Sequence, residues 1–179
     1  MLESISNPIR LGILAEEGSR LAYGPALASL TTVRPVALWT GEEDVASLRS
    51  WTRQLRSCTI CNAPEDLLLD ASIDAVLIAC RSDMRSSYAL QALRAAKHAL
   101  VEPPITADPL DLERLVSEAA RANLLLVPAH ALRHDPAVTE AHHRIALGEV
   151  GAVRELRCEW SCRQGWIQRR WQRQPWYSA

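Results

Sequence analysis

Short continuous apolar runs alternate along the chain with longer stretches in which apolar residues recur every three or four positions. Continuous runs are typical of parallel strands that are covered on both faces. They predict strands at 9–14, 35–39, 58–61, 75–80, 98–101 and 124–127. The amphipathic stretches predict helices at 20–30, 43–56, 64–69, 84–96 and 108–122. This alternation with short connections predicts an α/β fold, a Rossmann-like doubly wound parallel sheet.

The regular alternation of predicted strands and helices ends after residue 128. A helical pattern covers 136–147, and an alternating pattern over 153–162 predicts a long, half-buried strand. We therefore divide the chain into a Rossmann-like domain, 1–128, and the first helix and strand of an incomplete α/β domain, 129–179, with a substrate-binding or dimerisation role.

Composition places the chain among ordinary globular proteins. It has 179 residues, 48% of them hydrophobic and 23% charged, and a net charge of −1. No apolar run approaches the ~20 residues that a membrane helix needs. The first residues lack the basic and apolar regions of a signal peptide. We expect a cytoplasmic protein that does not engage a membrane.

The last part of the chain is basic and rich in tryptophan. From Arg154 onward, six arginines and two glutamates give a charge of +4 among four tryptophans. Such a segment suits phosphate contacts and base stacking. The chain as a whole lacks the basic excess of a nucleic-acid binder. The segment is better interpreted as the beginning of the second domain.

Five cysteines raise the question of a metal or redox site. Cys58 and Cys61 form one close pair, and Cys158 and Cys162 form another. Zinc needs four converging ligands, whereas residues three apart in a strand point to opposite faces. Buried, reduced thiols are therefore favoured over a metal or redox centre.

The first strand-to-helix turn is where a Rossmann fold binds a dinucleotide, through the pattern G-x-G-x-x-G. When the chain is aligned to this pattern, the three glycine positions hold Ala15, Glu17 and Arg20. Gly18 is expected to make the turn more flexible. The carboxylates of Glu16 and Glu17 would repel a pyrophosphate. The alternative role for these acidic residues is to stabilise the helix dipole.

Two further polar positions follow strands. Thr40 stands where an acidic residue normally binds the ribose, and it can offer one neutral hydrogen bond there. His130 follows the last Rossmann strand and is a candidate acid–base group. His142 and His143 are adjacent on a helix, so they diverge and are expected to be solvated.

The chain resembles the Gfo/Idh/MocA family of NAD(P)-dependent sugar and polyol oxidoreductases. The resemblance is carried by the stretches Ile-Asp-Ala-Val-Leu-Ile-Ala at 73–79, Ala-Leu-Gln-Ala-Leu at 89–93, Lys-His-Ala-Leu-Val-Glu-Pro-Pro at 97–104, Ala-His-Ala-Leu-Arg-His-Asp-Pro-Ala-Val at 129–138 and Gly-Glu-Val-Gly-Ala-Val at 148–153. It implies a Rossmann-type domain, an α/β domain with a large open sheet, and NAD or NADP as the cofactor.

The family's Glu-Lys-Pro motif, which helps to hold nicotinamide and substrate, reads Glu102, Pro103 and Pro104 here. Proline can neither carry charge nor donate a proton. Glu102 and His130 are the candidate catalytic residues. The candidate cofactor-binding residues are Ala15, Glu17, Gly18, Arg20, Thr40, Glu102 and Pro104. The family's distal substrate residues would lie beyond residue 179.

Two hypotheses follow. The chain is an oxidoreductase nucleotide-binding domain that still binds NAD(P), with weak or no activity alone. Alternatively it is a truncated, non-catalytic relative, a pseudoenzyme that serves as an accessory subunit. An exposed edge strand at 153–162 would need a partner. We expect that partner to be a second copy or a homologous chain.

Overall fold

A computed structural model describes residues 7–15, 17–41, 53, 55 and 58–157 of the chain. The elements are β1 (Ile9–Ala15), α1 (Glu17–Ser29), β2 (Val33–Trp39), β3 (Thr59–Ile60), α3 (Pro64–Leu68), β4 (Ala75–Ala79), α4 (Ser82–Arg94), β5 (His98–Val101), α5 (Pro109–Ala122), β6 (Leu126–Pro128), the 3₁₀ turn η1 (Ala131–His134) and α6 (Pro136–Ala146).

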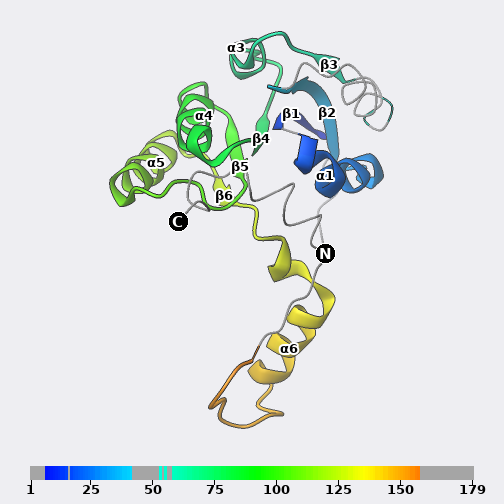
Figure 1. The fold of residues 1–179 in the computed structure, drawn as a ribbon, viewed down its shortest axis with the longest axis vertical. Coiled ribbons are helices and arrows are strands. Elements are labelled where there is room, and N and C mark those ends of the chain that lie inside the picture. Colours follow the sequence, from blue (N-terminus) through cyan, green and yellow to red (C-terminus); the bar gives the residue numbers. More distant parts are fainter. Residues whose placement is uncertain (1–6, 16, 42–52, 54, 56–57, 158–179) are drawn as a thin grey trace.

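The described strands form one parallel sheet in the order β3-β2-β1-β4-β5-β6 (Figure 1). This is the order of a dinucleotide-binding Rossmann fold, in which two halves meet between the first and fourth strands. The predicted fold class is therefore confirmed. The carboxyl ends of β1 and β4 lie side by side at the point where the strand order reverses.

Two apolar layers cover the sheet. On one face, α3, α4 and α5 contribute Leu67, Leu93 and Leu115 to a core that includes alternate strand residues. On the other face, Leu27 of α1 and Leu55 pack against the intervening strand residues. Alternation within each strand thus supplies both faces, as expected for a buried parallel sheet. The predicted helix 43–56 lies almost wholly outside the described residues.

Most element bounds match the sequence prediction, but two differ in an informative way. Helix α1 begins at Glu17, three residues earlier than predicted. Strand β6 covers Leu126–Pro128, and it is not the fully buried strand predicted at 124–127. Leu125 is 63% exposed and Val127 is 42% exposed. The reason is that β6 lies at the edge of the sheet and, among the described strands, pairs with β5 alone.

Beyond the sheet, η1 and α6 extend away from the Rossmann layers (Figure 1). Asp135 caps α6 by accepting hydrogen bonds from the amides of Ala137 and Val138, and Pro136 occupies its first turn. Residues 153–157 are exposed and belong to no strand, so this part of the predicted strand 153–162 is wrong for the isolated chain. An alternating pattern needs a neighbouring strand to supply hydrogen bonds. Residues 158–162 lie outside the described part.

Within the described residues, no helix combines the length and apolar character that crossing a bilayer requires.

Candidate functional site

The carboxyl edge of the sheet gathers the residues that the sequence singled out. Ala15 ends β1, and Thr40 follows β2. Glu102 follows β5, and its amide continues the ladder by donating to the Ile78 carbonyl at 2.9 Å. His130 lies two residues after β6. Because all these strands are parallel, their carboxyl ends share one edge, where this class of fold binds ligands.

The turn after β1 is unusually short. Strand β1 ends at Ala15 and α1 begins at Glu17, so one residue separates them. Gly18 and Arg20 therefore lie inside α1, and the expectation that Gly18 softens the turn is wrong. Ala15 is fully buried. The helix N-terminus carries a partial positive charge that suits an anion, but the residue that opens this helix is itself acidic.

Arg85, in the first turn of α4, makes four hydrogen bonds at this edge. Its Nη2 donates to Glu102 Oε2 at 2.9 Å, and its Nε donates to the Cys80 carbonyl at 2.8 Å. Its Nη1 donates to the carbonyls of Pro103 at 2.9 Å and Pro104 at 3.3 Å. Both charged side chains are about 95% buried, with exposed fractions of 5% and 6%. Glu102 is thus a buried partner of Arg85.

A second ion pair lies nearby, at the start of the same helix. Arg81 Nη2 contacts Asp83 Oδ2 at 2.7 Å, and its Nε donates to Asp83 Oδ1 at 3.1 Å. Hydrogen bonds from Arg81 hold the pKa of the Asp83 carboxyl below its ordinary value. Both arginines that follow β4 are therefore already paired with carboxylates of the chain itself. Neither adds net positive charge to the edge.

The remaining candidate residues at this edge are more exposed than Glu102. The Pro103–Pro104 peptide bond is cis, and both proline side chains are exposed. His130 is exposed and its amide donates to the Pro128 carbonyl at 2.9 Å. The buried Glu102 and the exposed His130 therefore have different environments. Thr40 is partly buried.

Arg85 was not among the site residues predicted from the sequence, although a signal was present. Arg85 is a long cation within an Ala/Leu-rich helix, on the same side as the buried residues Ala89 and Ala92. At helical spacing, positions 85, 89 and 92 share one face. A charge on an apolar face requires a buried partner. Glu102, an acidic residue at the same sheet edge, could supply this partner.

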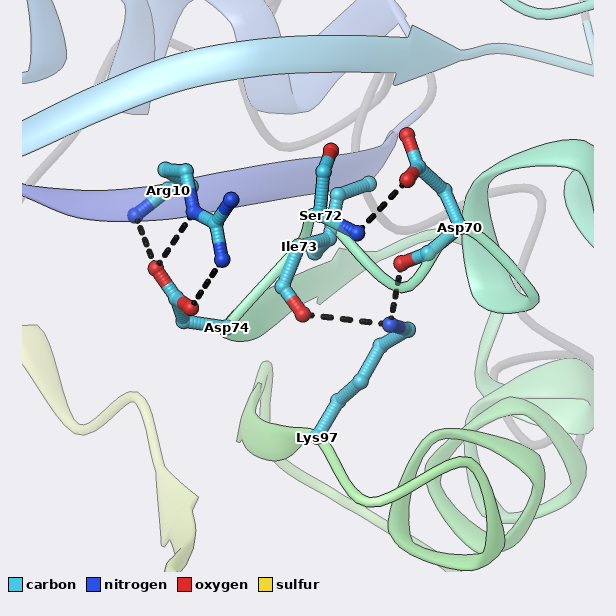
Figure 2. Close-up of polar contacts among 6 residues, drawn as sticks. All are labelled: Arg10, Asp70, Ser72, Ile73, Asp74 and Lys97. Atoms are coloured by element: carbon cyan, nitrogen blue, oxygen red, sulfur yellow. Dashed lines mark hydrogen bonds and ion pairs between the residues drawn. The ribbon is translucent and has the colours of Figure 1, made fainter.

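The opposite, amino end of the sheet holds another charged cluster (Figure 2). Arg10, in β1, contacts Asp74 through Nη2 to Oδ1 at 2.8 Å and Nε to Oδ2 at 3.1 Å. The Arg10 amide also donates to Asp74 Oδ2 at 2.8 Å. These hydrogen bonds hold the pKa of Asp74 below its ordinary value. This pair joins the beginnings of two neighbouring strands, which is a structural role.

Lys97 belongs to this amino-end cluster. Its Nζ donates to the carbonyls of Asp70 at 2.6 Å and Ile73 at 3.1 Å (Figure 2). The residue is 2% exposed, and burial lowers the pKa of its ammonium group. Lys97 precedes β5, whereas Glu102 follows it, so the chain's lysine lies at the wrong end of the sheet for the candidate site.

The first cysteine pair is split by the sheet, as predicted. Cys58 packs against the core on the α1 face, whereas Cys61 packs against the core on the α3–α5 face. Burial raises the pKa of the Cys58 thiol to about 12, and it also raises the pKa of Cys61. The described residues contain no group of three or more metal-ligating side chains. Cys158 and Cys162 lie outside the described residues.

Comparison with protein families identifies a match over more than half of the chain. The sequence profile described as "Oxidoreductase family, NAD-binding Rossmann fold" (GFO_IDH_MocA) matches residues 29–130. This range runs from Ser29, the last residue of α1, to His130, two residues after β6, and it includes the Arg85–Glu102 pair.

Individual relatives agree with this match. The chain is 30% identical over 132 residues to dTDP-3,4-didehydro-2,6-dideoxy-alpha-D-glucose 3-reductase of Streptomyces violaceoruber, which is 74% of this chain and 38% of the relative. It is 24% identical over 148 residues to myo-inositol 2-dehydrogenase of Thermotoga maritima, 83% of this chain and 41% of that enzyme. The chain thus spans less than half the length of these relatives.

A solved structure is also similar. The crystal structure of KijD10, a 3-ketoreductase from Actinomadura kijaniata, in complex with NADP and TDP-benzene, superposes with a TM-score of 0.68 at 26% identity. The similarity covers 79% of this chain and 43% of that one.

Proposed function

The chain belongs to the Gfo/Idh/MocA family of oxidoreductases with an NAD-binding Rossmann fold, and from that premise we propose that it binds NAD or NADP weakly and transfers no hydride alone. The observation that carries the proposal is the carboxyl edge itself. The two arginines that follow β4, Arg81 and Arg85, are each paired with a carboxylate of the chain, and the motif residue Glu102 is buried in the second of these ion pairs.

Weak binding follows from the electrostatics of the phosphate site. Glu17 is the first residue of α1, and Glu16 precedes it in the sequence. A pair of like charges at ~4 Å costs about 1 kcal/mol in water and ~4 kcal/mol near a protein surface. Arg81 does not offset this cost because Asp83 already neutralises it. We expect a dissociation constant on the order of 0.1–1 mM for NADH.

The lack of hydride transfer follows from the residues beside the nicotinamide half. Pro103 has no proton to donate, and its carbonyl is occupied by Arg85. Glu102 is held by the same guanidinium. A bound NAD or NADP would supply the hydride chemistry, with Ala15 and Thr40 beside its adenosine half and Pro104 beside its nicotinamide half. The family description names NAD and the KijD10 structure contains NADP, and together they support a dinucleotide ligand of one of these two kinds.

Removing the two acidic charges at the turn tests the electrostatic argument. The double variant E16Q/E17Q keeps side-chain size and is expected to bind NADH at least about tenfold more tightly, because the repulsion of the pyrophosphate is gone. Isothermal titration calorimetry with NADH and NADPH measures the change.

A matched control changes net charge equally at a distant surface. Glu113, on α5, and Glu149, after α6, are both exposed, and E113Q/E149Q is expected to leave the affinity within about twofold. Equal tightening in both variants would show a general charge effect. Micromolar binding by the unmodified chain would contradict the proposed weakness.

We also propose that the chain pairs with a second copy or a homologous subunit through 153–162. Four large apolar side chains around this segment support pairing, because they are 51% to 75% exposed: Leu147, Val150, Val153 and Leu156. Large apolar side chains that are exposed close together in the sequence are typical of interaction sites. Light scattering is expected to give about twice the chain mass of 19.9 kDa. A monomer across micromolar concentrations would contradict pairing.

A further inference from the structure

One buried guanidinium joins three segments at the carboxyl edge. Arg85 begins on α4, reaches back to the end of β4 through the Cys80 carbonyl, and reaches across to the loop 102–104 after β5. The residue is 4% exposed. Its four hydrogen bonds therefore fix the position of this loop relative to β4 and α4.

The loop depends on this donor for a chemical reason. Pro103 and Pro104 have no amide N–H, so the two residues can take part only through their carbonyls. Both carbonyls accept from Arg85 Nη1. A guanidinium is a rigid planar fork that can serve several acceptors at set angles, whereas a lysine ammonium is a point charge on a flexible stem.

The place of the loop in the fold indicates which part of a ligand it meets. In this strand order, each half of the sheet binds one mononucleotide, and the residue after β2 contacts the adenosine ribose. The half formed by β4, β5 and β6 therefore receives the other nucleotide, which carries nicotinamide. Loop 102–104 follows the middle strand of that half.

We infer that Arg85 is a positioning residue, which sets the loop 102–104 against the nicotinamide half of a bound dinucleotide. The inference rests on the proposed dinucleotide binding. Arg85 is not expected to touch the ligand, because it is 4% exposed and its hydrogen bonds go to Glu102 and to backbone carbonyls. It acts through the loop.

Comparing NADH with ADP-ribose separates this role from a general structural one, since ADP-ribose lacks nicotinamide. R85K keeps a cation beside Glu102, but the lysine ammonium cannot reproduce the planar guanidinium that serves several acceptors at set angles. We expect NADH affinity to fall about tenfold and ADP-ribose affinity to change less than about twofold. The matched control is R94K, because Arg94 is an exposed arginine at the end of the same helix. Dissociation constants come from ¹H–¹⁵N NMR titrations.

The possible results distinguish the positioning role of Arg85 from dinucleotide binding itself. Equal losses for both ligands, or no loss for either, would overturn the positioning role while leaving dinucleotide binding intact. If the unmodified chain binds neither ligand, the proposed function fails and this inference fails with it. A second measurement needs no variant: NADH, but not ADP-ribose, is expected to shift the amide signals of Glu102 and Ile105. Identical shifts from both ligands would overturn the inference.

Discussion

Replacing Arg85 with methionine is expected to lower the free energy of unfolding by about 3–5 kcal/mol. The substitution leaves the Glu102 carboxylate buried without its cation, in a side chain 6% exposed. It also removes the donors to the carbonyls of Cys80, Pro103 and Pro104. Urea denaturation at neutral pH measures the loss.

The double variant R85M/E102M is the control for this result. Replacing both partners of a buried ion pair by apolar side chains is often neutral, whereas removing one partner is costly. We therefore expect the double variant to recover most of the lost stability. If the single and double variants were equally unstable, the loss would come from the carbonyl contacts and not from the buried charge.

Replacing Lys97 with methionine is expected to lower the free energy of unfolding by about 2 kcal/mol. The change keeps the packing volume but removes the donor to the carbonyls of Asp70 and Ile73. Each buried acceptor that loses its partner costs about 1–3 kcal/mol. Part of that cost is offset because a buried ammonium no longer has to be desolvated.

The matched control for K97M is R94M, which removes an exposed cation three residues earlier in the chain. It is expected to change stability by no more than about 0.5 kcal/mol. Thermal and urea denaturation of both variants provide the comparison. A K97M variant as stable as R94M would show that water satisfies the two carbonyls.

Continuous apolar runs were enough to predict the sheet. The runs that became β1 and β4 are buried on both faces, and their side chains alternate between the two cores. The same reasoning was wrong at β6, because an apolar run does not reveal whether a neighbouring strand or helix covers it. Exposure of Val127 is a property of its position at the sheet edge.

The candidate site was predicted in part. Strand ends locate Thr40, Glu102 and His130 at one edge, because parallel strands place their carboxyl ends together. The sequence did not reveal that Glu102 is neutralised by Arg85, since that contact joins residues on different elements. The bounds of α1, which place Gly18 inside the helix, depend on how tightly β1 passes into it.

The carboxyl edge is proposed to be a weak dinucleotide site, and an NMR titration of the unmodified chain with NADH tests this proposal most directly. We predict saturable shifts with a dissociation constant of about 0.1–1 mM, roughly −5.5 to −4 kcal/mol. The shifted amides should be those that follow the strands, such as Thr40, Glu102 and His130. No saturable shift at about 10 mM NADH, or shifts centred on Arg10 and Asp74 at the amino end, would contradict the account.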